Sequence, residues 1–342
     1  MQKYEKKISY LCKVIIRLLM MRCRFSVLLI LCALWCGDGV SQEAPLRVAF
    51  WNVENFFDTK HDTLKNDMDF TPQGANHWTQ KRYEDKRHKI YKIVAAMEWP
   101  AVMGMAEVEN EWGLKGLCMG TPLRKMGYDY VHYESPDVRG VDCAMIYRRD
   151  KFKVLESKPI CVSDSSENFF TRDILMVKGL LKRRGGDDTC YLFVNHWPSK
   201  LGGATADRHR LEIAQKLLTI MDSLNHCKPG ALILAMGDFN ASPDEEAISK
   251  GLEFENNCSN TRGLYNLVYQ IENGIGSYKY QGVWSCIDQM ICNQDLEFEI
   301  FAPEVMLEND VKYMGKKLFR TYLGMRYRGG YSDHLPIIVS LP

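Results

Sequence analysis

The chain has 342 residues, enough for one large domain or two small ones, and it is 46% hydrophobic and 25% charged. These values are ordinary for a globular protein with a sizeable core, which needs no disulfides or metals to hold its fold. The formal net charge of +1 at pH 7 excludes a strongly basic protein that coats nucleic acid.

The first predicted element is a secretory signal. Residues 22–37 place two arginines before an apolar run of about a dozen residues. The small residues Gly39 and Ser41 lie three positions and one position before Gln42, which predicts cleavage after Ser41. Residues 1–41 are therefore interpreted as a signal peptide, and we expect an exported protein, periplasmic or extracellular.

The apolar run from Phe25 to Trp35 is short against the roughly 20 residues of a membrane-spanning helix, so we expect no transmembrane segment in the mature chain. Acylation of Cys36, as in a lipoprotein, stays open, although the bulky Trp35 before it disfavours this processing. Residues 1–20 are interpreted as an upstream extension, because a methionine at the end of that range would open a conventional signal.

Without residues 1–41 the chain keeps 37 Lys and Arg against 41 Asp and Glu, a net charge of about −4. It also keeps eight cysteines, which are scattered and show no metal-ligand spacing. Several, such as Cys143 and Cys190, lie in apolar runs where cysteine acts as a small buried residue, and disulfide pairing stays open. We expect residues 42–342 to form a single domain and the protein to be a monomer.

Six short apolar runs, each with a polar cluster, are predicted strands. Runs of this length that are rich in Val, Ile, Leu and Phe are typical of buried strands. They cover residues 46–55, 100–110, 190–199, 231–240, 284–292 and 331–341. Further strand-like runs follow one another between residues 128 and 181.

Two long helices are predicted between these runs, over residues 79–97 and 204–224, because apolar residues recur at helical spacing. The expected apolar stripe of the first helix consists of Tyr83, His88, Tyr91, Val94 and Ala95. Strands in succession with helices outside them predict an α/β fold, in which sheets pack face to face under helices as one domain.

The predicted strands carry residues that bind metals or move protons. These residues are Asn52 with Glu54 and Asn55, Glu107, His196 after Asn195, Asp238 with Asn240, Asp288, and Asp333 with His334. Six such clusters predict one rim of a sheet, where carboxylate and amide oxygens meet a hard divalent cation and histidines meet a phosphate.

Six motifs occur in a fixed order over nearly all of residues 42–342: "WNVEN", "MAEVEN", "NHWPS", "GDFN", "CID" and "YSDHLP". Together they resemble the endonuclease/exonuclease/phosphatase superfamily, and the longer stretches "FWNVENFFDT" and "NHWPSKLGG" are similar to a secreted bacterial subgroup of it. The resemblance implies a four-layered α/β sandwich, with two mixed β-sheets packed face to face and helices outside. It also implies hydrolysis of phosphate esters that depends on Mg²⁺ or Mn²⁺.

The resemblance further implies metal-site roles for three residues. Glu107 matches the metal-binding glutamate, and Asn52 matches the asparagine that supports the metal and the phosphate. Asp333 matches a further contact to the metal or to water.

Catalytic roles are implied in the same way. Asp238 and Asn240 match the pair that activates and orients the attacking water. Asp288 matches the acid that orients the imidazole of His334, and His196 matches the histidine that donates to the scissile phosphate or its leaving oxygen. Attack by water needs a base for its proton, and the sequence leaves open whether Asp238 or His334 is that base.

Three arginines are candidate substrate contacts. Arg172 in "FFTRDIL" resembles a family arginine that contacts phosphate, with a structural ion pair as the alternative. Arg320 and Arg326 belong to residues 312–330, where basic and aromatic residues alternate before the Asp-His pair. This segment is either a solvated loop or a contact surface for an anionic substrate.

Three functions stay open. The first is an exported metal-dependent phosphoesterase that cleaves phosphodiesters in a nuclease-like way, with nucleic acid as a candidate partner. The second is a phosphatase or phosphodiesterase that acts on phospholipid head groups, inositol phosphates or sugar phosphates. The third is an inactive secreted binding protein on the same fold, against which the complete set of acids and histidines argues.

Overall fold

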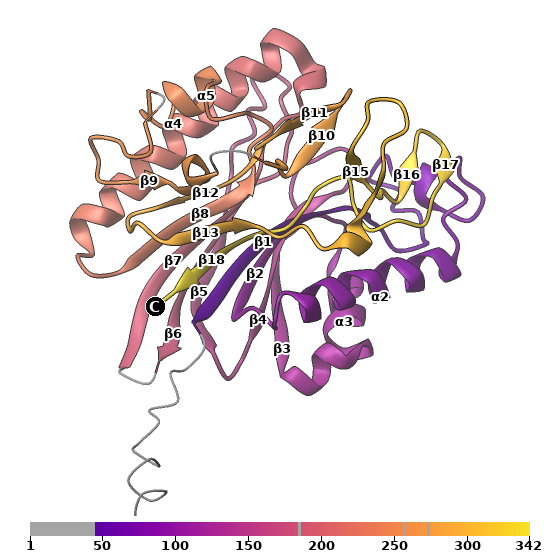
Figure 1. Cartoon of the computed structure of the whole chain (residues 1–342), viewed down its shortest axis with the longest axis horizontal. Coiled ribbons are helices and arrows are strands. Elements are labelled where there is room, and N and C mark those ends of the chain that lie inside the picture. Colours follow the sequence, from indigo (N-terminus) through magenta and orange to yellow (C-terminus); the bar gives the residue numbers. More distant parts are fainter. Residues whose placement is uncertain (1–44, 184–185, 256, 272–273) are drawn as a thin grey trace, which may run out of the picture. The chain divides into compact units, whose positions relative to one another are not determined.

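Two six-stranded β-sheets form the frame of the protein (Figure 1). The computed structural model describes residues 45–183, 186–255, 257–271 and 274–342. The predicted signal peptide, residues 1–41, lies outside the described residues. Leu46–Pro342 forms one compact unit. Among the described helices, none has the length and apolar character needed to cross a bilayer.

The first sheet has the strand order β13-β18-β1-β2-β4-β3. Only β1 and β2 run parallel in it, and the other neighbours are antiparallel. Its strands are β1 (Leu46–Phe56), β2 (Val102–Val108), β3 (Tyr128–His132), β4 (Asp142–Arg148), β13 (Glu297–Ile300) and β18 (Ile337–Leu341).

The second sheet has the order β5-β6-β7-β8-β12-β9, again with one parallel pair, β7 and β8. Its strands are β5 (Phe152–Ile160), β6 (Ile174–Arg183), β7 (Gly186–His196), β8 (Leu232–Asp238), β9 (Tyr265–Asn266) and β12 (Asp288–Cys292). Both sheets are therefore mixed, as the family resemblance implied.

Three two-stranded hairpins and the helices complete the described elements. The hairpins are β10 (Tyr278–Tyr280) with β11 (Val283–Ser285), β14 (Leu307–Asn309) with β15 (Lys316–Leu318), and β16 (Tyr322–Leu323) with β17 (Arg326–Tyr327). The α-helices are α2 (Gln80–Ala96), α3 (Glu111–Gly120), α4 (Gly203–Cys227) and α5 (Glu246–Ser249). Short 3₁₀ turns are η1 (Met68–Phe70), η2 (Pro122–Met126), η3 (Lys200–Gly202), η4 (Leu267–Gln270) and η5 (Glu304–Met306).

Each sheet contains the same βαβ unit at its centre. Parallel neighbours need a long crossover connection, and α2 supplies it between β1 and β2, whereas α4 supplies it between β7 and β8. An antiparallel strand lies beside each unit: β18 pairs with β1, and β12 pairs with β8. The two sheets are thus built on one repeated topology.

Helix α2 confirms the predicted helix at residues 79–97, but the predicted stripe was wrong in part. Tyr83 and Val94 are buried as expected, whereas His88 is exposed. The buried face instead includes Ile90, Ile93 and the lysine Lys86. Lys86 is buried because its ammonium group finds two oxygen acceptors in a distant segment, which hydropathy alone does not reveal.

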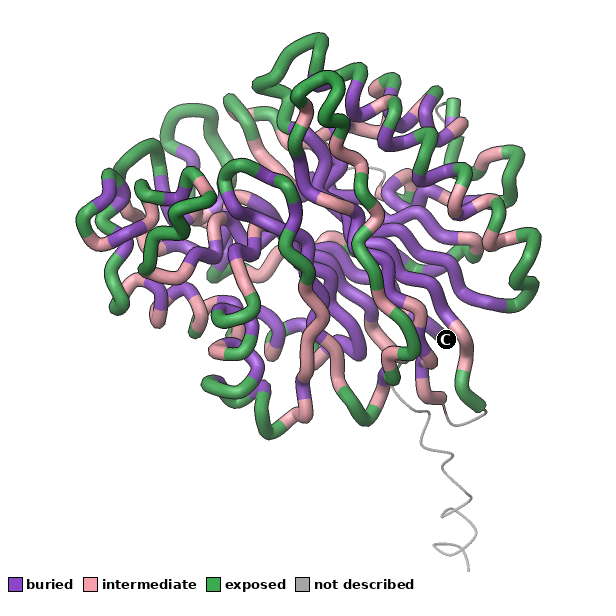
Figure 2. Tube along the Cα trace, turned by 180° about the vertical axis from the view of Figure 1, so that it is seen from behind, coloured by how far each residue is buried: buried purple, intermediate pink, exposed green. Residues whose placement is uncertain are grey.

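The two sheets pack face to face through a central hydrophobic core. Val48, Phe50 and Val339 of the first sheet belong to one buried cluster with Val194 and Met236 of the second. Gly104 in β2 permits this close approach, because a Cβ atom there would lie only 3.0 Å from Met236 Sδ and 3.1 Å from Val194 Cγ2. Figure 2 shows the strands buried and the connecting loops exposed.

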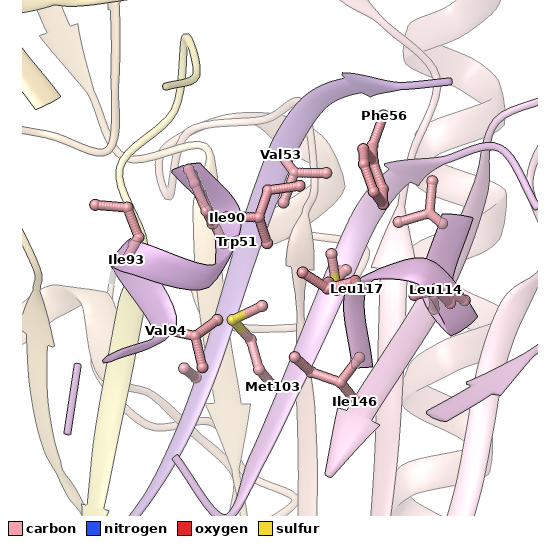
Figure 3. Packing of buried hydrophobic residues seen from close by; sticks show 14 of the residues in the cluster. Trp51, Val53, Phe56, Ile90, Ile93, Val94, Met103, Leu114, Leu117 and Ile146 are labelled. Carbon is pink, nitrogen blue, oxygen red and sulfur yellow. The ribbon is translucent and has the colours of Figure 1, made fainter. Parts of the chain in front are cut away.

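Helices cover the outer faces of both sheets and make the outer two layers. On the first sheet, Ile90 and Val94 of α2 and Leu117 of α3 pack on Trp51 and Met103 (Figure 3). On the second sheet, α4 packs its apolar face on residues of β7 and β8 in the same manner. Each fully buried Leu or Ile contributes about 1.5 to 3 kcal/mol to the free energy of unfolding. The architecture is the expected four-layered α/β sandwich.

All eight cysteines of the described residues are free thiols. Cys143 in β4 and Cys190 in β7 are buried in the central core, which confirms their interpretation as small apolar residues. Cys161, Cys227 and Cys258 are exposed.

Candidate active site

The predicted site residues converge at one end of the sandwich. Because the carboxyl ends of parallel neighbours lie at the same edge of a sheet, β1 and β2 bring Asn52 and Glu107 there, and β7 and β8 bring His196 and Asp238.

The antiparallel neighbours β12 and β18 begin at this same end. Asp288 is the first residue of β12 and pairs with Asp238, and Asp333 and His334 directly precede β18. The expectation of one rim of a sheet was therefore wrong. The site lies between the corresponding rims of two sheets, because each sheet carries its own parallel pair.

Asp238 lies at the centre of the cluster. Its Oδ2 atom lies 3.7 Å from Nε2 of His196 and 3.7 Å from Nε2 of His334. Asn52 Nδ2 donates to the same oxygen over 3.0 Å, and the backbone N–H of Asn240 donates to Oδ1 over 2.9 Å. Burial and the nearby charge of Asp288 raise the pKa of Asp238 to about 7, although the charge of His334 acts in the opposite direction.

His334 forms a buried pair with Asp288. Its Nδ1 atom lies 2.8 Å from Asp288 Oδ2, so the other ring nitrogen faces Asp238. Burial would lower the pKa of His334, but the carboxylates of Asp288 and Asp238 more than offset this and raise it well above its ordinary value. The two carboxylates therefore favour the charged form of the ring. The backbone is also held, since the His334 carbonyl accepts a hydrogen bond from Trp51 Nε1 at 3.0 Å.

His196 has the opposite electrostatic setting. Burial, reinforced by the positive charges of Arg172 and Arg139, lowers its pKa well below the ordinary value. Its Nε2 atom lies 4.0 Å from Glu107 Oε1, and its buried Nδ1 atom has no hydrogen-bond partner among the described residues. The site thus places two imidazoles against the same Asp238 oxygen, and their surroundings shift the two pKa values in opposite directions.

Glu107 sits where the first sheet becomes irregular. Its φ angle is +62°, and the pairing of β2 with β4 shifts register between Ala106 and Val108. The backbone N–H of Asn55 donates to Glu107 Oε2 over 2.8 Å. Oε1 remains beyond hydrogen-bond distance of its nearest cation, Arg139 Nη2, at 3.7 Å.

Asn52 and Asn240 each connect Asp238 to a neighbouring part of the backbone through hydrogen bonds. The backbone N–H of Glu54 donates to Asn52 Oδ1 over 3.0 Å, so the Asn52 amide joins the end of β1 to Asp238. Asn240 donates through Nδ2 to the carbonyl of Trp197, at 3.0 Å, beside His196. Its φ angle of +47° belongs to the left-handed region, which asparagine tolerates better than most residues.

Of the three predicted arginines, two have defined places near the cluster. Arg320 forms an ion pair with Asp333, whose Oδ1 atom lies 3.9 Å from His334 Nε2. Burial would raise the pKa of Asp333, but the charges of His334 and Arg320 lower it below the ordinary value. Arg326 lies exposed in β17 and makes no hydrogen bond or ion pair with the other site residues in the described part of the chain.

Arg172 is buried in the ion pair that was its alternative interpretation. Its Nη1 atom donates to Asp137 Oδ2 over 3.0 Å, and its Nη2 atom donates to the Trp197 carbonyl over 2.8 Å. It therefore braces the residue after His196, and it acts on His196 through its charge.

The sequence did not single out Arg139, although it is the cation nearest Glu107. It lies on the loop between β3 and β4, and Asp137 on the same loop binds Arg172. No motif marks Arg139, because its proximity arises from a turn that brings this loop over the end of β2. The local sequence offers only the basic side chain of Arg139 itself, two positions after Asp137.

Lys86 was missed for the same reason, whereas Glu54 was named with Asn52 but without a role. Lys86 Nζ donates to Thr321 Oγ1 and to the Tyr331 carbonyl, at 2.6 Å each. Glu54 accepts from the backbone N–H of Thr321 over 2.7 Å. Burial, with Asp333 adding to it, raises the pKa of Glu54 to about 7, and burial lowers the pKa of Lys86 to about 8. The pair fastens the segment that carries Arg320 and Asp333.

With this geometry in view, the comparison with known proteins identifies the fold family. The family model described as "Endonuclease/Exonuclease/phosphatase family" matches residues 47–342. The chain belongs to the endonuclease/exonuclease/phosphatase family. No curated protein matches the sequence.

Solved structures with the same fold include other members of wide functional range. D. rerio TDP2, humanized by 14 mutations, is 16% identical with a TM-score of 0.54, covering 86% of this chain and 98% of that one. The human Nocturnin catalytic domain is 16% identical with a TM-score of 0.52, covering 86% and 93%. A Bacteroides thetaiotaomicron mannosyl-6-phosphatase is 16% identical with a TM-score of 0.53, covering 86% and 98%. At this identity the likeness shows the shared fold.

The residues of this family member fit a hard divalent cation. Glu107, Asp333 and Asn52 offer oxygen donors, which Mg²⁺ and Mn²⁺ prefer, and Glu107 Oε1 has no hydrogen bond to any residue that the structure describes. Burial is the main cause of the raised pKa of Asp238, and a cation bound nearby would favour its charged form. Asp238, Asp288 and His334 also lie close enough together to form a potential metal cluster.

Proposed function

We propose that the protein hydrolyses phosphate esters with the help of Mg²⁺ or Mn²⁺. One observation carries this proposal: a buried carboxylate, Asp238, lies 3.7 Å from the facing Nε2 atoms of two imidazoles, His196 and His334. Hydrolysis needs a group that takes a proton from water and donors that stabilise charge on the phosphate, and this arrangement supplies both.

Asp238 is the proposed base. Its pKa of about 7 is close to that of an effective proton acceptor near neutral pH. Hydrogen bonds from Asn52 and Asn240 orient the carboxylate, and each of its oxygens is held by one of them. His334 is less suited to this role, because the carboxylates of Asp288 and Asp238 raise its pKa and so favour the protonated ring, which has no free lone pair for the proton of water.

His334 and His196 are the proposed donors to the phosphate. Asp288 holds the His334 ring through Nδ1, which leaves the Nε2 proton for a phosphate oxygen. His196, on the opposite side of Asp238, offers a neutral donor whose position is braced by Arg172. The charge that gathers on the equatorial oxygens during attack would therefore meet donors on both sides.

Glu107, Asn52 and Asp333 would hold the cation. When bound, it would supply positive charge that neutralises the phosphate during attack by water. Arg320, which pairs with Asp333, is the proposed contact for a further anionic oxygen of the substrate.

Among substrates, we propose phosphodiesters first and phosphomonoesters of sugars, inositols or lipid head groups second. The printed name of the B. thetaiotaomicron relative, a mannosyl-6-phosphatase, supports testing the second class. Turnover of bis(p-nitrophenyl) phosphate and p-nitrophenyl phosphate should be measured with Mg²⁺, with Mn²⁺ and with EDTA. Absence of turnover for both esters under all metal conditions, with the Asp238→Asn variant as background control, would favour the inactive binding protein.

We further propose that the protein works outside the cytoplasm, on the basis of the predicted signal peptide. Mass spectrometry of the protein from its native host should find a mature N-terminus at or near Gln42. An intact N-terminus on a cytoplasmic protein would contradict export.

A further inference from the structure

Three hairpins, β10–β11, β14–β15 and β16–β17, are joined into a ridge by side-chain contacts, and Figure 1 shows where their strands lie. Lys279 at hairpin β10–β11 donates to Asp310 Oδ2 over 3.0 Å and to the Lys316 carbonyl over 2.7 Å, which attaches this hairpin to β14–β15. Arg328, just after β17, donates to Glu308 Oε2 in β14 over 2.8 Å, which attaches the third hairpin to the second.

The turns of these hairpins carry apolar side chains that face solvent. We call residues 280–283, 311–314 and 323–326 the hairpin tips. Their exposed apolar residues are Tyr280, Val283, Val311, Tyr313, Met314, Leu323 and Met325, of which the two tyrosines are less exposed than Val311, Met314 and Val283. Val311 is 90% exposed, Met314 79% and Val283 70%, so these side chains contribute almost nothing to the core. Turns are normally built from polar residues and glycine. A single exposed apolar residue needs no explanation, but exposed apolar residues on three neighbouring turns indicate an interaction surface.

The charged side chains of the hairpin tips and their flanks that form no ion pair within the described part of the chain are all positive. The two acids of this ridge, Glu308 and Asp310, are already paired with Arg328 and Lys279. Lys312, Lys316 and Arg326 are exposed, and they form no ion pair with any described residue. A partner of this surface therefore has apolar and anionic character at once.

The ridge is connected to the candidate active site at two points. Tyr278, which opens β10, forms an isolated β-bridge with His334, and their rings lie 4.9 Å apart. Arg320, between β15 and β16, pairs with Asp333. Whatever binds the hairpin tips is thus held beside the reacting centre.

We propose that the hairpin tips dock this protein on the surface of a membrane that contains anionic lipid. Apolar side chains on separate turns can each enter the interface of a fluid bilayer, and the free cations can meet the negative head groups. This inference goes beyond the proposed function, because docking requires no hydrolysis.

A second copy of the chain is disfavoured as the occupant by charge. A symmetric contact would bring Lys312, Lys316 and Arg326 against the same residues of the other copy, without acids to compensate them. Single-stranded nucleic acid is disfavoured by side-chain type, since stacking on bases uses aromatic planes and the most exposed tip residues are Val311 and Met314.

The test is sedimentation of the protein with vesicles of phosphatidylcholine, with and without phosphatidylglycerol. Val311→Ser with Met314→Ser removes apolar contact, and Lys312→Glu with Lys316→Glu reverses charge. Leu64→Ser, which changes a side chain 87% exposed elsewhere, and Lys115→Glu on α3 are the matched controls. All variants are produced in the native host and so have the same N-terminus. Differences in vesicle binding between them therefore come from the substituted residues.

We expect binding to the anionic vesicles that falls at least tenfold in each tip variant, persists in both controls, and weakens with added salt in the wild type. Turnover of a soluble nitrophenyl ester should stay unchanged in the tip variants, which separates loss of docking from damage to the site. Equal vesicle binding by the wild type and the tip variants, or no binding at all, would overturn the proposal. So would tip-dependent dimerisation in light scattering, or tip-dependent binding of single-stranded DNA without vesicle binding.

Discussion

The two halves of the candidate site share a topology but are held in place differently. In the second sheet the ladder is regular to its end, with His196 opposite Asp238 and Asp238 opposite Asp288. In the first sheet the pairing shifts register beyond Asn52, and Glu107 adopts a positive φ angle. A strained backbone conformation of this kind costs about 1 to 3 kcal/mol per residue, so the surrounding structure must hold it in place.

The difference shows where each half obtains its precision. The regular half places the backbones of Asp238, Asp288 and His196 through an unbroken strand ladder, and side chains such as Asn52 then orient the Asp238 carboxylate. The irregular half relies on side chains from distant segments, because Arg139 faces Glu107 and Lys86 fastens the segment before Asp333. We therefore expect substitutions in the regular half to damage chemistry without unfolding, and substitutions behind the irregular half to damage stability as well.

The largest effect is expected in the regular half, for Asp238→Asn. The change keeps the size of the side chain and its hydrogen bond from Asn240, but removes the proposed base. Turnover should fall by about 10⁴-fold, the upper end for a proton-transfer group. Steady-state kinetics with a nitrophenyl ester measures the loss, and an unchanged melting temperature is the control. Turnover within tenfold of wild type would remove Asp238 from the chemistry.

Glu107→Gln is the corresponding change in the irregular half. A cation ligand contributes several kcal/mol of transition-state stabilisation, so turnover should fall on the order of 10³-fold, and saturation should require more Mg²⁺. Titration of activity with Mg²⁺ measures both effects. Near-normal turnover with an unchanged Mg²⁺ requirement would show that Glu107 is not a ligand.

Lys86→Met tests the supports of the irregular half. It removes the two buried hydrogen bonds that the Lys86 ammonium donates to Thr321 and Tyr331, and it takes away a positive charge that compensates the buried Glu54. Hydrogen bonds to a charged group contribute about 1.5 to 3 kcal/mol each, so the free energy of unfolding should fall by about 3 kcal/mol. Urea unfolding measures the change. The matched control is Lys92→Met, on the exposed side of the same helix, which should change the free energy of unfolding by less than about 1 kcal/mol. Equal losses for the two lysines would contradict a specific role of Lys86.

His334→Ala crosses between the halves, since His334 precedes a first-sheet strand and pairs with Asp288 of the second. As a donor rather than a base it should contribute about 10² in turnover, the lower end for such groups. Asp288→Asn should cost less, and the double variant scarcely more than His334→Ala, because the two act as one unit. Additive losses, or full activity in the folded fraction of His334→Ala, would refute the paired mechanism.

The sequence predicted the regular parts of the molecule well. Buried strands and the two long helices follow from apolar runs and helical spacing, and the polar residues at strand ends identify the cluster. Two sheets were expected, but the sequence did not show which sheet holds each site residue. A residue at the end of a strand has the same local pattern in either sheet. Strand pairing is a long-range property, and here it separates Asn52 from His196.

The supports of the irregular half were also beyond local patterns. Lys86 occupies a core-facing position in α2, yet hydropathy assigns lysine to the surface, so its buried hydrogen bonds to Thr321 and Tyr331 leave no trace in the spacing. Arg139 and Glu54 depend in the same way on loops brought together by the tertiary fold. The hairpin tips show the converse, since their apolar residues resemble core residues and are exposed.

The location of the site between two sheets has a consequence for the cohesion of the sandwich. A ligand that contacts Glu107 and Asp238 together spans both sheets, and any opening that separates them must first release it. By linkage, the binding free energy then adds to the free energy of that opening. Backbone amides at the ends of β2 and β8 near the site would exchange their hydrogens more slowly in the bound protein, whereas those at the opposite ends of the same strands would respond less. Ligand binding at the site would therefore stabilise the packing of the two sheets against each other.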